Sequence, residues 1–503
     1  MKLKIYNTLT RQKEEFIPLM EDPNYKGPKK DFVGIYSCGP TVYSLPHFGN
    51  LRAAFTADLI RNVIKNILGY KTKFVMNITD VGHMVGDGDH GEDKMEKGAR
   101  LEGASVRDVA KKYENIFRVF FKGLNIDDFD YMPRATESIK DQIKFIQIIE
   151  SKGYTYIVPE DGIYIDTSKI SDYGKLLGPN YKKALEGIQA GERIDMGGKK
   201  NSTDFALRKF SPKDQKRQME RDSPRGIGFP GWHSECCVMS SNYLGHQFDI
   251  HHGGVDLLPI HHTNEIVQSE IVFDVNPRVK YRIHHQFVNM NGKKMSKSDG
   301  NNADPSEVLE KGYDYLDIRY WFLTAQYNSF LDFTRKGIGQ IKNARENLIR
   351  KLKMNNEKLK IKKLDLFVNI SYLDLETLLQ TRDSKNFFNE IVQAICDDFN
   401  TPKLLSIINT GLANANGEIM QIIYRLEKKL LKIGLFDFEE IQEKNKNLEN
   451  IPQEISDLVE QRLIAKKNKN FQLSDELRNE IKNLGREIKD TKDGYEVTKL
   501  SNH

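Results

Sequence analysis

The sequence predicts an α/β protein: a Rossmann-like parallel-sheet domain with an insertion, followed by an α-helical bundle and a small C-terminal α+β domain. Three observations lead to this prediction. A strand–helix–strand pattern opens the chain, a stretch of different composition interrupts the pattern at about residues 131–224, and apolar residues at helical spacing dominate beyond about 336. The length of 503 residues also favours about three domains.

The opening unit starts with a β-prone run at 33–36. A loop rich in Gly and Pro follows, and then apolar residues recur at helical spacing from Leu51 to Ile67. Gly69 is expected to end this helix, and residues 74–78 are expected to form the next strand. Because a helix joins the two strands, we expect them to pair in parallel within one sheet.

The insertion contains its own predicted hairpin, because residues 154–158 and 162–166 flank a Pro-Glu-Asp turn. Sheet-like character returns at 248–251. It returns again at 283–289, a run that ends in the turn signal Asn291-Gly292. The Rossmann-like core is therefore expected to join two separate parts of the chain, about 15–130 and 225–290.

The remainder of the chain is predicted to be helical. Thr401-Pro402 marks one helix start, and an apolar stripe at 419–433 is closed by Gly434. An earlier helix has one apolar face, made of Ile338, Ile341, Leu348 and Leu352. After a polar linker, a helix at 474–484 and a hairpin around Asp493-Gly494 predict a small terminal domain. The expected domain bounds are 1–335, 336–438 and 454–503.

Composition excludes several classes of protein. The sequence has no run of about 18 apolar residues that would predict a membrane-spanning helix. The N-terminus lacks the apolar segment of a signal peptide, and four cysteines make no disulfide framework for a chain this long. We therefore expect a cytoplasmic protein with free or metal-bound thiols. A net charge of +5 is compatible with a polyanionic partner and equally with a lysine-rich, solvated surface.

The first chemical motif is the His-Phe-Gly-Asn run that contains His47, Gly49 and Asn50. It lies between a predicted strand and the start of a predicted helix, where backbone N–H groups and the helix dipole favour phosphate. Glycine lets a ligand approach the backbone, and the His and Asn side chains can donate hydrogen bonds to phosphoryl oxygens. Taken alone, the run is better explained as an ordinary loop with an exposed histidine.

The second motif is the lysine-rich loop at 293–300, which contains Lys294 and Lys297. It follows a predicted strand and turn and lies among Ser and Gly residues. Such a cationic loop can close over a triphosphate. A solvated basic loop explains this motif about equally well when it is considered alone.

The third motif combines histidines, cysteines and a glutamate. Six of the 12 histidines fall within residues 231–265, together with Cys236 and Cys237. His261 and Glu265 are four residues apart, so on a helix they share one face and can hold one metal ion. A thiolate from Cys236 or Cys237 would add a ligand. The pattern predicts a zinc site.

Together these motifs resemble the class I aminoacyl-tRNA synthetases. The run at 47–50 looks like the HIGH signature of that class, and 294–298 matches its KMSKS signature letter for letter. Within the class, the chain resembles the cysteinyl-tRNA synthetases over nearly its whole length. The matching runs are 36–43, 77–80, 190–195, 230–236, 261–265 and 398–402, with a further match at 475–485.

This resemblance implies a role for particular residues. One Zn²⁺ would be held by Cys38, Cys236, His261 and Glu265, and ATP would be bound by His47, Gly49, Asn50, Asp256 and Lys297, with Asp256 on the ribose. Thr79 and Trp232 would line the amino-acid pocket. The residues expected to act in catalysis are His47, Asn50, Lys294 and Lys297. Asn50 departs from the last His of the signature, but it keeps a hydrogen-bond donor.

The resemblance also implies a reaction and partners. L-Cysteine would be activated with ATP and Mg²⁺ and transferred to cysteine tRNA, and the zinc would select the substrate by its thiolate. We expect a monomer. An acidic loop at 86–93 has no role in this scheme.

Two other functions fit part of the sequence. A cysteine ligase that joins cysteine to an amino-sugar would keep the zinc and adenylate chemistry, but it would leave the helical and terminal domains without a role. A non-catalytic RNA-binding paralogue is disfavoured by the intact signatures and by the complete set of four inferred ligands.

Overall fold

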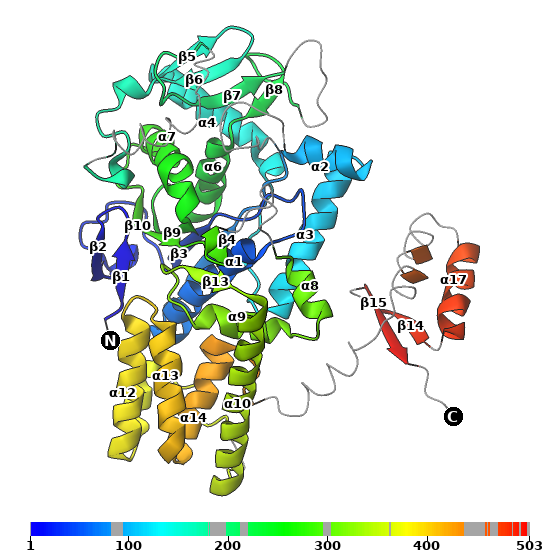
Figure 1. Ribbon diagram of the computed structural model, residues 1–503. Coiled ribbons are helices and arrows are strands. Elements are labelled where there is room, and N and C mark those ends of the chain that lie inside the picture. Colours follow the sequence, from blue (N-terminus) through cyan, green and yellow to red (C-terminus); the bar gives the residue numbers. More distant parts are fainter. Residues whose placement is uncertain are drawn as a thin grey trace. The chain divides into compact units, whose positions relative to one another are not determined.

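Figure 1 shows a computed structural model of the chain. It describes residues 2–81, 94–179, 181, 198–211, 220–294, 303–361, 364–436, 458–459, 461–462, 471–484, 486–491 and 494–499. The chain divides into two compact units, Met1–Leu435 and Phe436–His503. Within the described residues, no helix is both long and apolar enough to cross a membrane.

A four-stranded parallel sheet forms the centre of the first unit. Its strand order is β10-β9-β3-β4, and every neighbouring pair is parallel, as predicted. The strands are β3 (Val33–Ser37), β4 (Thr72–Met76), β9 (Phe248–Gly254) and β10 (Val279–His285). The two central strands, β3 and β9, therefore come from the two separate parts of the chain that the sequence predicted.

Two helices connect the strands in opposite directions from the middle of the sheet. Helix α1 (Phe48–Asn62) continues into a π-helical turn, Val63–Ile67, and leads from β3 to β4. Gly69 follows with φ +81°, as expected of the residue that ends the helix. Helix α7 (Thr263–Phe273) leads from β9 to β10. The strand order therefore reverses between β3 and β9, and ligands of open α/β sheets bind beyond the carboxyl ends of strands at such a point.

The single strand predicted at 283–289 is wrong. β10 ends at His285, and the chain leaves the sheet at Gln286 and Phe287 before β11 (Val288–Met290) begins. The carbonyl oxygens of Gln286 and Phe287 accept hydrogen bonds from the buried Arg52 guanidinium, which replaces strand pairing there. Apolar periodicity cannot reveal such a partner, which comes from α1.

β11 belongs to a separate three-stranded sheet of order β12-β11-β13, with β12 (Lys293–Lys294) and β13 (Leu331–Phe333). The predicted turn at Asn291-Gly292 is confirmed, since both residues have positive φ, 51° and 77°. These values suit a two-residue hairpin turn. β11 and β12 therefore form a hairpin that carries the chain into the lysine-rich loop.

The inserted segment forms an antiparallel sheet of order β5-β6-β7-β8. Its strands are β5 (Thr155–Val158), β6 (Gly162–Ile165), β7 (Ala206–Phe210) and β8 (Gly228–Pro230), so the predicted hairpin is confirmed. Helix α4 (Ile139–Ser151) contributes Phe145, Ile146 and Ile149 to the apolar core of this sheet. The sheet extends to Pro230, and helix α6 (Trp232–Leu244) begins directly after it.

The helices after the core are α8 (Pro305–Glu310), α9 (Tyr315–Leu323), α10 (Arg335–Leu359), α11 (Tyr372–Leu378), α12 (Arg382–Cys396), α13 (Thr401–Gly411) and α14 (Gly417–Leu426). Figure 1 shows α10, α12, α13 and α14 side by side. The predicted apolar face of α10 is buried at Leu348 and Leu352. The last helix ends in a π-helical turn at Leu431, and Lys432 takes the left-handed conformation (φ 53°) before Gly434 is reached. The Lys432 side chain forms an ion pair with Asp127 at 2.6 Å.

The second unit is a small α+β structure, as predicted. Helix α17 (Phe471–Asn483) precedes β14 (Arg486–Thr491) and β15 (Gly494–Lys499), which pair antiparallel. Its apolar core contains Leu458, Val459, Leu477, Ile481 and Ile488. The first residue of the expected hairpin turn, Asp493, lies outside the described residues.

Candidate active site

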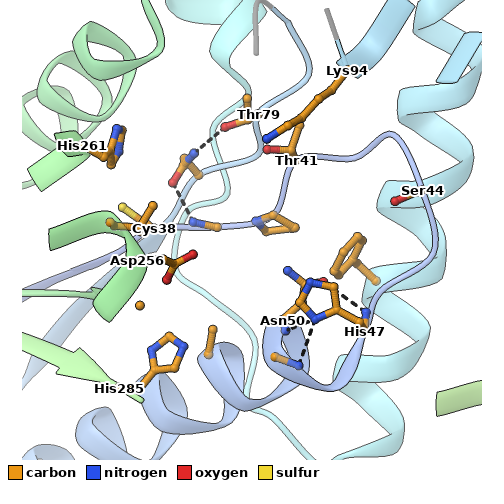
Figure 2. A pocket seen from close by; sticks show the side chains of 18 of the residues that line it. Cys38, Thr41, Ser44, His47, Asn50, Thr79, Lys94, Asp256, His261 and His285 are labelled. Carbon is orange, nitrogen blue, oxygen red and sulfur yellow. Dashed lines mark hydrogen bonds between the residues drawn. The ribbon is translucent and has the colours of Figure 1, made fainter. Parts of the chain in front are cut away.

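A cavity of about 370 Å³ lies at the carboxyl edge of the central sheet. Figure 2 shows that the loops after β3, β4 and β9 and the start of α1 supply its walls. The cavity brings together most of the residues that the sequence predicted for the site: Cys38, His47, Gly49, Asn50, Thr79, Trp232, Cys236, Asp256 and His261. The structure therefore gathers residues from distant parts of the chain at the point where the strand order reverses.

His47 is the N-cap of α1. Its Nδ1 accepts hydrogen bonds from the backbone N–H groups of Gly49 (3.0 Å) and Asn50 (3.4 Å), and Asn50 Oδ1 accepts one from the His47 N–H (3.1 Å). This reciprocal arrangement is a capping box. Since Nδ1 accepts, the neutral ring carries its proton on Nε2. A Cβ at position 49 would lie 2.8 Å from the capping ring, so glycine is needed here for the cap itself.

The opposite wall is fixed by Asn77, which follows β4. Its Nδ2 donates to Thr79 Oγ1 at 3.1 Å, and its Oδ1 accepts from the Gly39 N–H at 2.9 Å. Figure 2 shows both bonds. A Cβ at Gly39 would lie 1.7 Å from the Asn77 carbonyl oxygen, so only glycine fits. Thr79 and the loop after Cys38 are therefore held against each other.

Four potential metal ligands meet beside this wall. The ligand atoms of Cys38, Cys236, His261 and Glu265 all lie within 4.8 Å of one another. The two Sγ atoms are 4.0 Å apart, and His261 Nε2 is 2.8 Å from Glu265 Oε1. The two thiols, separated by 198 residues in sequence, come from the loop after β3 and from α6. This is the set that the resemblance implied.

A second group of four shares two of these residues. The ligand atoms of Cys38, His251, His262 and Glu265 also lie within 4.8 Å of one another. Cys236 and His261 line the cavity, but His251 and His262 do not. A metal ion in the first group would therefore face the cavity, while one in the second group would lie behind the cavity wall.

His261 is held on both sides. The Trp232 ring stacks on its imidazole with centroids 4.0 Å apart and an interplanar angle of 15°, and His233 Nδ1 lies 2.9 Å from its Nδ1. Burial disfavours the charged imidazolium, but the Glu265 carboxylate and the Cys236 sulfur outweigh burial and raise the pKa of His261 to about 10. Sequence reading placed Trp232 in the amino-acid pocket and did not detect this contact.

The donor atoms of the cluster suit a metal ion, which would take the place of the protons on the imidazole and the thiols. Burial would raise the pKa of Glu265, but His251 and His261 lower it well below its usual range. The contact with Cys38, together with burial, raises the pKa of Cys236, and burial raises that of Cys38. Two thiols, an imidazole and a carboxylate are the donors that Zn²⁺ prefers, and a bound cation deprotonates thiols. The residues present therefore fit a zinc ion.

The neighbouring thiol points elsewhere. Cys237 is fully buried, and its Sγ donates to the backbone carbonyl of Glu265 at 3.4 Å. It packs in the apolar core of the insertion with Phe145 and Leu207. Of the two adjacent cysteines, only Cys236 belongs to the ligand cluster.

Several residues of the cavity were not predicted. Thr41, Ser44, Lys94 and His285 line it, and Figure 2 labels all four. Thr41 and Ser44 follow Cys38 in the loop after β3, so they could have been found from their position. Lys94 opens helix α2 (Lys94–Glu102), and no motif marks it.

Other predicted features lie outside the described residues. These are Lys297 and the rest of 295–300, the side chain of Lys294, the acidic loop 86–93 and the run 190–195.

Solved structures share the fold. Mycobacterium tuberculosis methionyl-tRNA synthetase in complex with methionyl-adenylate aligns with a TM-score of 0.52 at 14% identity, covering 84% of this chain and 95% of that chain. The LeuRS of Agrobacterium radiobacter K84, in a ternary complex with tRNA and LeuAMS, aligns with a TM-score of 0.58 at 11% identity, covering 83% and 85%. The fold is that of the class I aminoacyl-tRNA synthetases.

Sequence comparison identifies one family within this class. The family model described as "tRNA synthetases class I (C) catalytic domain" matches residues 25–343. The cysteine–tRNA ligase of Treponema denticola is 36% identical over 494 residues, covering 96% of this chain and 97% of that protein. That of Thermococcus gammatolerans is 37% identical and covers 98% of both. The chain belongs to the cysteine–tRNA ligase family.

Proposed function

We propose that this protein activates L-cysteine with ATP to cysteinyl-adenylate and transfers the cysteinyl group to the 3′ end of cysteine tRNA. The observation that carries the proposal is that one cavity is lined both by a thiol-containing ligand cluster and by the N-terminus of α1. A metal ion held by the ligand cluster would bind a substrate thiol, and the N-terminus of α1 suits a phosphate group. The full-length match to cysteine–tRNA ligases supports a tRNA acceptor over an amino-sugar acceptor.

One Zn²⁺ per chain would be held by Cys38, Cys236, His261 and Glu265. When bound, it would supply a Lewis acid that stabilises a thiolate and so distinguishes cysteine from serine by chemistry and not by size. The stack of Trp232 on His261 and the contact of His261 with His233 orient this ligand. Trp232 and Thr79 also line the cavity, where they would confine the rest of the amino acid.

The ATP phosphates would lie at the start of α1. The capping box leaves the proton of the neutral His47 ring on Nε2, which can donate to a phosphoryl oxygen, and Asn50 can donate through its amide nitrogen. Gly49 allows close approach, and Asp256 would bind the ribose. Lys294, Lys297 and Mg²⁺ would neutralise charge as the cysteine carboxylate attacks the α-phosphate and pyrophosphate leaves.

We assign these steps to the domain at 1–335 and tRNA binding to the helical domain at 336–438 and the terminal domain at 454–503. Lys297→Ala should then slow adenylate formation and leave zinc bound. A monomer acting in the cytoplasm completes the proposal.

The test is cysteine-dependent ATP–pyrophosphate exchange together with zinc content. Cys236→Ser should remove both the zinc and the preference for cysteine over serine. Cys237→Ser is the matched control, since this thiol bonds a backbone carbonyl within an apolar core and should leave both properties intact. Loss of zinc in Cys237→Ser but not in Cys236→Ser would reverse the assignment, and a wild-type protein without cysteine-dependent exchange would refute the proposed function.

A further inference from the structure

Arg52 is a buried arginine in the first turns of α1, two residues after Asn50 of the capping box, and the residue is 1% exposed. Nη1 donates to the carbonyl oxygens of Gln286 (3.1 Å) and Phe287 (3.0 Å), and Nη2 donates to those of Gln326 (3.0 Å) and Ser329 (2.7 Å). The guanidinium therefore joins α1 to two other segments of the chain at once.

In the part of the chain that the structure describes, no acidic group forms an ion pair with Arg52, and burial lowers the pKa of Arg52 to about 10. A buried charge that is compensated only by carbonyl dipoles costs folding free energy, and apolar residues often fill such a place at lower cost. Arg52 is therefore expected to have a role beyond packing.

The first segment that Arg52 holds forms part of the cavity wall. Gln286 and Phe287 line the cavity, as does Val288, which begins β11. The same segment continues into the β11–β12 hairpin at Lys293–Lys294 and so into the lysine-rich loop. Displacing residues 286–287 would therefore shift both the wall and the base of that loop relative to α1.

The second segment is anchored from its other side. Asp398 accepts hydrogen bonds from Tyr327 Oη (2.9 Å), Asn328 Nδ2 (3.3 Å) and the Tyr6 N–H (2.9 Å). Asp398 itself stands at φ 58°, in a conformation that a non-glycine residue adopts only when its surroundings impose it. Arg52 therefore ties the cavity wall to a firmly held support.

We infer that Arg52 is a positioning residue for adenylate formation. It holds the 286–287 wall and the base of the β11–β12 hairpin at a fixed distance from the capped start of α1. The start of α1 and the strand that leads into the lysine-rich loop, both proposed to serve ATP binding, thereby keep their relative positions. Arg52 does not line the cavity and acts only through these backbone segments. The inference rests on the proposed function of the cavity.

The test is Arg52→Lys, assayed by pyrophosphate exchange, zinc content and melting temperature. Lysine keeps the charge, but its ammonium is a compact group that cannot reproduce the planar fork that spans two segments. A shift of about 1 Å at reacting groups costs roughly 10²-fold in rate, so kcat for exchange should fall about a hundredfold. KM for cysteine and zinc content should change less than about twofold, because Arg52 does not contact the ligand cluster.

Arg425→Lys is the matched control. Arg425 is also buried, and its Nη1 donates to the carbonyls of Phe367 (2.7 Å) and Val368 (2.8 Å), within the helical region. It should lower the melting temperature as Arg52→Lys does and leave kcat unchanged. Equal kcat in the two variants would show that Arg52 is only a structural brace and would overturn the inference.

A second variant covers the case in which Arg52→Lys does not fold. Arg52→Gln removes the buried charge and keeps two N–H donors, and its folded protein should show the same loss of kcat. If neither variant folds, Arg52 serves folding and the positioning role is rejected. Pyrophosphate exchange by the wild-type protein separates this inference from the proposed function. If the wild type shows no exchange, the proposed function fails. If it does, the Arg52 variants decide whether Arg52 is a positioning residue.

Discussion

His47 caps α1 with the same ring that is proposed to bind phosphate. Its Nδ1 accepts two backbone N–H groups at the start of α1, so the proton of the neutral ring is on Nε2. The sequence indicated that His47 and Asn50 could donate to phosphate, but it did not indicate that each also completes the cap of the helix. The cap fixes the tautomer, and the tautomer makes the ring a donor.

Substitution at His47 can separate the two roles. Asn is a good N-cap, so His47→Asn should keep the helix start while it removes the Nε2 donor. His47→Ala should remove both and cost about 1 kcal/mol of additional stability. We expect both variants to lose exchange activity and only the alanine variant to show a lower urea midpoint. If His47→Asn kept full exchange, the ring would have no role in phosphate binding.

The buried histidines predict a pH dependence of stability. Burial lowers the pKa of His252 and of His284 to about 3, while an unfolded histidine titrates near about 6.5. The unfolded state therefore binds more protons below pH 6.5, and stability falls as the pH falls. Each of these two histidines should lower the free energy of unfolding by about 1.4 kcal/mol for each pH unit below 6.5.

Urea unfolding between pH 7 and 5, with a chelator present throughout, measures this effect. His252→Asn should reduce the slope of unfolding free energy against pH by about one proton. His246→Asn is the control, because His246 is exposed. A slope that is the same in the wild type and in His252→Asn would contradict the prediction.

At the scale of elements, the sequence predicted most of the structure and missed the tertiary contacts. The strands of the core, the hairpin of the insertion and the apolar face of α10 follow from periodicity. The division of 283–289 into β10 and β11 does not, because the carbonyl groups between the two strands bond to Arg52 of α1, a contact between distant segments. Lys94 and His285 likewise reach the cavity through packing of distant segments, and neither belongs to a motif.

A buried ion pair joins α1 to the helical region, and breaking it is expected to lower the free energy of unfolding. Asp58 of α1 and Arg319 of α9 form an ion pair at 2.9 Å with both side chains fully buried. Arg319 also donates to the carbonyl of Leu431, at the end of the last helix of the first unit. Asp58→Asn leaves the Arg319 charge uncompensated and should lower the free energy of unfolding by about 3–5 kcal/mol.

Denaturant unfolding followed by circular dichroism tests this prediction. The control is Asp31→Asn, which breaks the exposed pair with Lys71 and should leave the midpoint unchanged. An Asp58→Asn midpoint equal to the control's would mean that water or a rearrangement satisfies Arg319.

At the scale of the whole molecule, the division into two units predicts separable activities. A chain ending at residue 450 keeps the unit Met1–Leu435, which contains the cavity, and lacks α17, β14 and β15. It should keep pyrophosphate exchange and lose most tRNA charging, because phosphate contacts and unstacked bases of the tRNA would lose their partners. Filter-bound charging of tRNA by folded truncated protein measures this. Charging at the full rate would remove the terminal unit from tRNA recognition.

The two thiols of the ligand cluster stand 198 residues apart in sequence, and this spacing has a consequence for synthesis. At about 5–20 residues per second, a ribosome delivers Cys236 roughly 10–40 s after Cys38. Throughout that interval the emerging chain carries only one of the four proposed ligands. Under the proposed function, the ligand set is complete only once Glu265 has been made, so zinc would be loaded late in the translation of the first unit.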